Sequence, residues 1–313
     1  MNSKEQEYTS TGTKLLHHPS VVSNIKRLRI GTPVSLQVAP TSRCNLNCSF
    51  CSNANREQHE DLPVEKLVTL LRELVPIGLK TVEWTGGGEP LLYKHLELAV
   101  FFTHELGLKQ GLITNGTLLS KMSKEILVKF QWIRVSMNCL DYRDAVELPD
   151  NIRGTLGFSY VMNDDTTAEI LTKLDEHVKR HKPSYVRIVP NCQATHEEQE
   201  VNNQRLSAMV SSWGEPYFYQ AKHFSKPKNC YWGYLKPFLL HNEWVYPCSS
   251  VVLNEDSDKT FHSKYKWVKM EELPGLYLSS MKGGDWDCTH CVFRPQNDII
   301  ESLLNPTGME DFI

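Results

Sequence analysis

The stretch VSLQVAPTSRCNLNCSFC, residues 34–51, joins a β-branched apolar run directly to three cysteines. These cysteines, Cys44, Cys48 and Cys51, have the spacing C-x3-C-x2-C, and no fourth cysteine lies nearby. Closed metal and cluster sites normally have four protein ligands. A three-thiolate set leaves one metal position open, which is what a metal needs if it is to bind a substrate. The alternative is a zinc site completed by His59 or by a distant residue.

Strand patterns alternate with amphipathic helical patterns along most of the chain. We expect strands at 34–39, 80–85, 108–114, 132–138, 155–162 and 184–190, and helices at 63–75, 94–107, 123–130 and 167–181. This alternation implies βαβ units, a parallel sheet and an α/β fold, with enough strands for a partial (β/α)6 parallel barrel. Active sites of such folds lie at the C-terminal ends of the strands, so the cysteine loop falls on that face.

The character of the sequence changes near Gly214, after which Gly, Pro, aromatic residues and Cys dominate. We therefore predict an N-terminal extension at 1–33, the partial barrel at 34–214 and a small cysteine-rich α+β domain at 215–313.

Composition excludes several classes of protein. The net charge is −3, there is no apolar run of 18 residues, and the N-terminus is polar, so we expect no membrane span and no secretory signal. Nine cysteines in such a chain indicate metal ligands or reactive thiols in a reducing, cytoplasmic setting. The charge balance does not support nucleic-acid binding, for which HVKRHKPSYVR (177–187) is the only local candidate.

A second motif, WTGGGEPLLY, occupies residues 84–93 at the end of the second expected strand. Three glycines after a strand let a ligand approach the backbone closely. Glu89 then offers a carboxylate that could hold the ammonium group of a molecule bound at the open metal position.

These two motifs together resemble the radical S-adenosylmethionine (radical SAM) superfamily over roughly residues 34–190. The resemblance implies a [4Fe–4S] cluster whose open iron binds S-adenosylmethionine, and reductive cleavage of that molecule to methionine and a 5′-deoxyadenosyl radical. It makes Cys44, Cys48 and Cys51 the cluster ligands. The cofactor contacts that it implies are Phe50, Gly87, Gly88, Glu89, Asn115, Ser136 and Val186.

Four further cysteines, Cys230, Cys248, Cys288 and Cys291, have the spacing C-x17-C…C-x2-C. LKPFLLHNEWVYPC predicts a hairpin that turns at 241–243 and brings the first pair together. The set resembles the Twitch domain, the shortened SPASM extension, which implies one auxiliary [4Fe–4S] cluster. Relatives carry Gly where this chain has Glu243, so we expect the turn to be made by Asn242 or by a looser geometry. A structural zinc site is the alternative.

Charged and thiol side chains near the expected strand ends are further candidates. Glu83, Arg134 and Arg187 lie inside apolar strands, where charge is rare unless it is paired. They could form an internal ion pair, or an arginine could bind a carboxylate or phosphate of the substrate. Cys139 and Cys192 each follow a strand and could return a hydrogen atom to a product radical, although a lone cysteine is more often buried packing.

We therefore expect a radical SAM enzyme, an oxidoreductase or isomerase, that abstracts hydrogen from a small or compact substrate and causes an oxidation or a rearrangement. The alternatives are an isomerase of amino-acid-modified thymidine in hypermodified phage DNA, a peptide or protein maturase, a zinc- or cluster-binding protein with a degenerate barrel, and an electron carrier. The expected partners are a small-molecule, nucleoside or peptide substrate and an electron donor such as flavodoxin or ferredoxin.

Overall fold

The computed structural model describes residues 3–53, 59–150, 152–253, 263–284, 286 and 288–311. Within them the strands form one sheet in the order β10-β9-β8-β1-β2-β3-β4-β5-β6-β7. Strands β1 to β7 and the pair β8–β1 are parallel, whereas β9 and β10 are antiparallel to their neighbours. The strands are β1 (Ser35–Ala39), β2 (Thr81–Trp84), β3 (Lys109–Thr114), β4 (Trp132–Ser136), β5 (Thr155–Met162), β6 (Tyr185–Pro190), β7 (Tyr217–Tyr219), β8 (Phe238–Leu240), β9 (Trp244–Tyr246) and β10 (Val268–Lys269).

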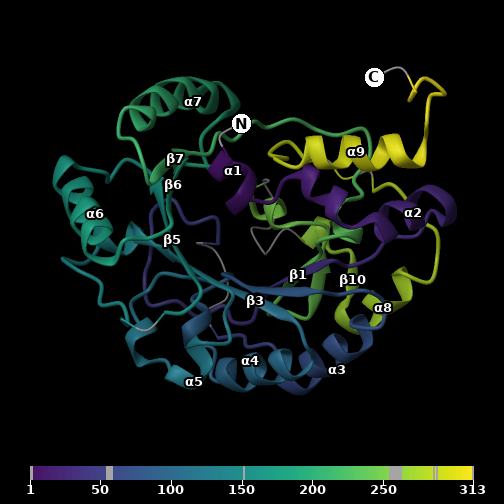
Figure 1. Cartoon of the computed structure of the whole chain (residues 1–313), viewed down its shortest axis with the longest axis horizontal. Coiled ribbons are helices and arrows are strands. Elements are labelled where there is room, and N and C mark those ends of the chain that lie inside the picture. Colours follow the sequence, from purple (N-terminus) through teal and green to yellow (C-terminus); the bar gives the residue numbers. More distant parts are fainter. Residues whose placement is uncertain are drawn as a thin grey trace.

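Helices lie along the outer side of this sheet. Figure 1 shows α3, α4, α5, α6 and α7 following one another around it, while α1 lies on the inner side near β7. The α-helices are α1 (Ser3–Tyr8), α2 (Pro19–Leu28), α3 (Val64–Leu74), α4 (Leu96–Glu105), α5 (Lys124–Leu127), α6 (Ala168–His181), α7 (His196–Ser211), α8 (Leu273–Leu276) and α9 (Arg294–Leu304). The parallel sheet with its outer helices confirms the predicted α/β partial barrel.

The two faces of the strands have different chemistry because side chains alternate along a strand. The outward residues are apolar and completely buried, as Val82, Leu112 and Ile133 show, and they join the helix residues Leu67 and Leu71 in one hydrophobic core. The inward residues are largely polar or charged and line a large cavity, which positions the site on the inner side.

The sheet continues beyond the predicted boundary near Gly214. Strand β7 pairs with β6, and β8 returns to pair with β1 at the other side of the sheet. The C-terminal hairpin therefore lies directly beside the strand that leads into the cysteine loop. Among the described helices, none has both the length and the apolar character needed to cross a membrane.

Candidate functional site

The cysteine loop begins immediately after β1, at the C-terminal end of the parallel strands. Burial and the neighbouring thiols of Cys51 and Cys44 raise the pKa of Cys48 to about 12, so the three thiols lie within electrostatic reach of one another. Raised thiol pKa values are expected where thiolates would repel one another, and a positive cluster would reverse this effect. The donor set of three thiols on one loop therefore fits a cluster with one open iron.

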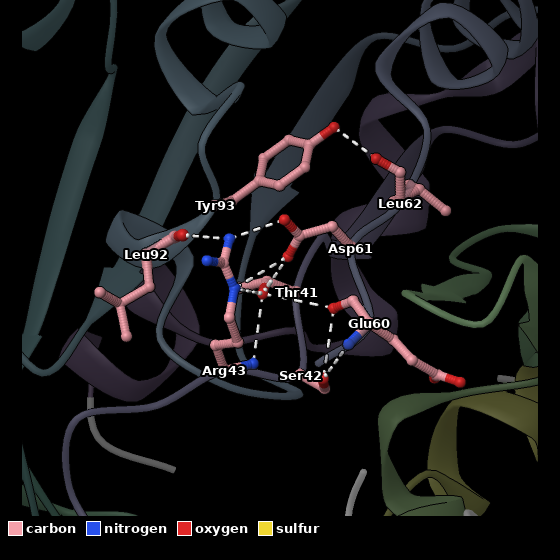
Figure 2. Close-up of polar contacts among 8 residues, drawn as sticks. All are labelled: Thr41, Ser42, Arg43, Glu60, Asp61, Leu62, Leu92 and Tyr93. Atoms are coloured by element: carbon pink, nitrogen blue, oxygen red, sulfur yellow. Dashed lines mark hydrogen bonds and ion pairs between the residues drawn. The ribbon is translucent and has the colours of Figure 1, made fainter. Parts of the chain in front are cut away.

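An ion-pair network clamps the start of this loop to its end (Figure 2). Arg43 donates to Asp61 from Nη2 at 2.6 Å and from Nε at 3.2 Å. The same Nη2 donates to the Leu92 carbonyl at 2.7 Å, and Thr41 donates its hydroxyl to Asp61 at 2.6 Å. The network joins the residues before the cysteines, the residues after the loop and the segment after β2. We call Thr41, Arg43 and Asp61 the loop clamp.

Backbone contacts close the same loop a second time. Ser42 N donates to the Glu60 carbonyl at 2.9 Å, and Glu60 N donates to Ser42 Oγ at 2.9 Å, as Figure 2 shows. Tyr93 donates its hydroxyl to the Leu62 carbonyl at 2.6 Å. The two ends of the loop are thus fixed to each other independently of any cofactor.

The glycine-rich segment packs tightly on this loop. A Cβ on Gly88 would lie 2.1 Å from the Arg43 carbonyl oxygen, and one on Gly87 would lie 2.9 Å from Nδ1 of His241. Glu89 N also donates to the Arg43 carbonyl at 2.7 Å. Glycine is therefore required at Gly88 because backbone occupies the space that a side chain needs.

The Glu89 carboxylate is buried and already has three donors. It accepts from the Thr114 hydroxyl at 2.6 Å, from Asn115 N at 2.7 Å and from Leu91 N at 3.1 Å. Burial raises the pKa of Glu89, and these hydrogen bonds oppose that rise. A carboxylate has about four acceptor sites, so one site remains for an ammonium donor.

A cavity of about 1590 Å³ extends from the cysteine loop along the inward strand faces to the N-terminal segment. Its volume exceeds that of a typical ligand pocket, which leaves room for a cofactor and a substrate together. The predicted site residues that line it are Cys48, Phe50, Cys51, Ser136 and Cys192.

Other predicted residues lie elsewhere. Val186 is completely buried and does not line the cavity, whereas Arg187 and Val189 of the same strand do, because the odd-numbered side chains of β6 point inward. Cys139 packs in the hydrophobic core with 1% exposure. Asn115 donates from its side chain to Asn45 of the cysteine loop at 2.8 Å, so it braces that loop.

The second cysteine set converges on one small cavity that Cys230, Cys248, Cys288 and Cys291 all line. Burial and the neighbouring thiols of Cys288 and Cys291 raise the pKa of Cys230 to about 12. Within the part of the chain that the structure describes, no three His, Cys, Asp or Glu side chains are close enough to hold a single metal ion.

The predicted hairpin is present as β8 and β9, and its turn is made by His241 and Asn242, followed by Glu243. Glu243 has φ +64°, the left-handed conformation that normally favours glycine. Its backbone N donates to the Leu240 carbonyl, its carbonyl accepts from Met270 N, and its carboxylate pairs with Lys66. The expectation that Asn242 makes the turn is confirmed, since Asn242 lies at its centre and its Oδ1 accepts from Trp244 N at 3.1 Å. The contacts of Glu243 offset the backbone strain at the position where relatives carry glycine.

Sequence reasoning did not identify the loop clamp. Arg43 immediately precedes the first cysteine, and this position is the feature of the sequence that could have indicated its role. Its partner Asp61 lies 18 residues away, beyond the cysteines, so only the fold reveals the pair.

Part of the chain matches a known protein family. Residues 38–163 match the model of the Radical SAM superfamily. An S-adenosylmethionine-dependent nucleotide dehydratase of Selenomonas ruminantium is 28% identical over 111 residues, 34% of this chain and 40% of that protein. A GTP 3′,8-cyclase of Synechococcus sp. is 39% identical over 95 residues, 29% of this chain and 27% of that protein. Each match thus spans less than half of the relative.

The crystal structure of Streptococcus suis SuiB bound to precursor peptide SuiA has a similar fold. The TM-score is 0.57 at 16% sequence identity, and the match covers 92% of this chain and 76% of that chain. Residues 38–163 of the present chain are thus similar to the Radical SAM superfamily. The cofactors of that family are a [4Fe–4S] cluster and S-adenosylmethionine, and the three-thiol loop fits them.

Proposed function

We propose that this chain cleaves S-adenosylmethionine reductively and uses the resulting 5′-deoxyadenosyl radical to remove a hydrogen atom from a compact substrate. The observation that carries this proposal is the continuous cavity, which is lined both by the cysteine loop and by the inward faces of the strands. A bound cluster would supply the electron that breaks the C5′–S bond. The cleavage gives methionine and the radical, and hydrogen abstraction gives 5′-deoxyadenosine and a substrate radical.

The residues of this chain would hold and orient the cofactors. Cys44, Cys48 and Cys51 would bind three irons, and the loop clamp would keep their loop in place before the cluster assembles. Glu89 would accept a hydrogen bond from the ammonium group, with Gly87 and Gly88 supplying the close approach of the segment. Phe50, Ser136 and Val189 would contact the rest of the cofactor, because they line the cavity.

A second metal centre would sit in the C-terminal region. Cys230, Cys248, Cys288 and Cys291 provide four thiols around one cavity, which fits a closed auxiliary [4Fe–4S] cluster. Replacing the three loop cysteines by alanine should leave about four irons per chain at this second centre. A variant that is free of iron and binds zinc instead would overturn this assignment.

Cys192 is the candidate hydrogen-atom donor, since it lines the cavity whereas Cys139 does not. Its S–H would give a hydrogen atom to a product radical and become a thiyl radical. One electron from the external reductant and one proton from solvent would restore the thiol. This step suits a rearrangement. The names of the two relatives support nucleotides as candidate substrates, and the precursor peptide bound to SuiB supports peptides.

Anaerobic incubation with S-adenosylmethionine, a chemical reductant such as dithionite and candidate substrates tests the proposal. We expect 5′-deoxyadenosine from the wild-type protein, and deuterium in it when a deuterated true substrate is present. A cluster-loaded protein that makes no 5′-deoxyadenosine under these conditions would contradict the proposed function. If every turnover requires reductant, the reaction is a rearrangement whose product radical is quenched by the thiol. If product continues to form without further reductant, the reaction is an oxidation that returns its electron to the protein.

A further inference from the structure

The large cavity has a charge of the opposite sign to the whole chain. Eight Lys or Arg residues line it against three Glu, whereas the net charge of the chain is −3. A cavity with one dominant sign of charge and low-dielectric walls attracts ligands of the opposite sign. The cavity is thus suited to an anionic ligand.

Three of these cations gather on one side of the cavity. Arg134 lies on β4, Arg187 lies on β6, and Lys222 follows β7. Arg134 and Arg187 precede the proposed cofactor contacts Ser136 and Val189 by two residues on the same inward strand faces. The cationic group therefore lies beside the cofactor site, farther from the C-terminal ends of the strands. We call Arg134, Arg187 and Lys222 the cation cluster.

The internal carboxylate that could have neutralised the cluster is already engaged. Glu83 pairs with Lys236 at 2.6 Å and accepts from Gln37 at 3.1 Å. Among the described residues, no ion pair involves any member of the cation cluster. The internal ion pair of Glu83 is thus formed with Lys236, and the charge of Arg134 lowers the pKa of Glu83 less than Lys236 does.

The arginines also retain donor capacity. Arg187 donates from Nη1 to Gln220 at 3.1 Å, and the Arg134 guanidinium lies 5.7 Å from the Trp132 ring centre. The Nε atoms of both arginines are buried and have no hydrogen-bond partner within the described structure. Buried donors without partners are costly, and charged ones most of all.

In addition to burial, the mutual repulsion of these groups lowers the pKa values of Lys222 and Arg187. Burial, followed by the charge of Arg187, lowers the pKa of Lys222 to about 8, and burial with Arg134 lowers the pKa of Arg187 to about 9. Glu5 is the nearby carboxylate that opposes this shift at Lys222, and its effect is the smallest of those acting there. An anion between the three cations would remove this penalty.

We propose that the cation cluster binds a carboxylate or phosphate group of the substrate and thereby fixes the substrate next to the cofactor. The proposal rests on the proposed function, since it gives the substrate of that reaction its place in the cavity. Cys192 lies within the electrostatic reach of Arg187 and Lys222, so a substrate held here would have its anionic end near that thiol.

The test titrates the cluster-loaded protein anaerobically with inorganic phosphate and, separately, with acetate, at constant ionic strength set by chloride. Binding is measured by calorimetry, and the melting temperature is recorded in parallel. Arg187→Met and Lys222→Met should each weaken anion binding by about tenfold or more, since each removes a charge-assisted hydrogen bond. The matched control is Lys179→Met, which removes a lysine that is 76% exposed on the outer helix α6 and should leave anion binding unchanged.

Each probe distinguishes one source of the anion. Tighter binding of phosphate indicates a phosphorylated substrate, and tighter binding of acetate indicates a carboxylate. General salt effects act equally on all variants, so only the difference between variants counts. If neither anion binds the wild type, or if both cluster variants bind as it does, the proposal is overturned. Formation of 5′-deoxyadenosine by the wild type is scored separately, so failure of the proposed function is distinguishable from failure of the anion site.

Discussion

At the scale of single residues, Glu89 has a structural role in addition to the cofactor contact that its motif implies. The family resemblance predicted its carboxylate but not its three protein donors, because Thr114 and Asn115 come from the next strand. The side chain therefore joins the ends of β2 and β3 and shapes the site before any ligand binds.

Replacing Glu89 by Gln should weaken binding of S-adenosylmethionine by about 1–3 kcal/mol, because a charge-assisted hydrogen bond becomes neutral. The amide also presents a donor where the carboxylate accepts from Thr114 or Asn115. Both iron centres should be retained. Equilibrium dialysis with labelled S-adenosylmethionine measures the affinity, and Glu97→Gln, on the exposed face of α4 where Glu97 accepts from Ser123 N, is the matched control. Unchanged affinity would show that Glu89 does not hold the ammonium group.

The loop clamp supplies a second prediction at this scale. Asp61→Asn should lower the free energy of unfolding by about 1 kcal/mol, a discounted value because the Arg43 side chain is 37% exposed. It should also reduce the iron bound by the loop cysteines, since the loop is no longer fixed before assembly.

Urea denaturation and iron analysis measure these two effects. The control is Asp144→Asn, which breaks an ion pair whose Asp144 side chain is fully exposed. Iron content equal to that of the wild type would contradict a role of the clamp in cluster assembly.

At the scale of elements, most strands were predictable, whereas the short strands β7 and β10 and several helices were not. Strand ranges such as 155–162 agree with the structure because their apolar alternation is strong. Helix α7 (His196–Ser211) escaped prediction because Gln199 and Asn203 occupy buried positions where an apolar stripe is expected. Helix α1 places Tyr8 against Tyr185, a contact between distant residues that no local pattern reveals.

The hairpin turn gives a prediction at this scale. Glu243→Gly should be more stable than Glu243→Ala by about 1 kcal/mol, because glycine adopts φ +64° without steric cost and alanine does not. Both variants lose the pair with Lys66, so their difference isolates the backbone effect. Urea denaturation of the two variants measures it, and equal stability would mean that the turn stores no strain.

At the scale of the whole molecule, the sheet joins the two cysteine sets. Strand β8 pairs with β1, so the C-terminal hairpin and the cysteine loop rest on neighbouring strands. The sequence predicted both cysteine sets and the barrel. It did not reveal this pairing, because β8 follows β1 by about two hundred residues and pairing partners are not encoded in local periodicity. The division into domains at 34–214 and 215–313 stays a prediction.

The central claim is that the loop of Cys44, Cys48 and Cys51 holds the cluster that cleaves S-adenosylmethionine. Its most direct test is anaerobic formation of 5′-deoxyadenosine, measured by liquid chromatography, in the wild type and in the single variants Cys44→Ala, Cys48→Ala and Cys51→Ala. We predict formation in the wild type and none above background in each variant, because the cluster loses a ligand that the loop cannot replace. Wild-type rates of formation in any one of the three variants would contradict the claim.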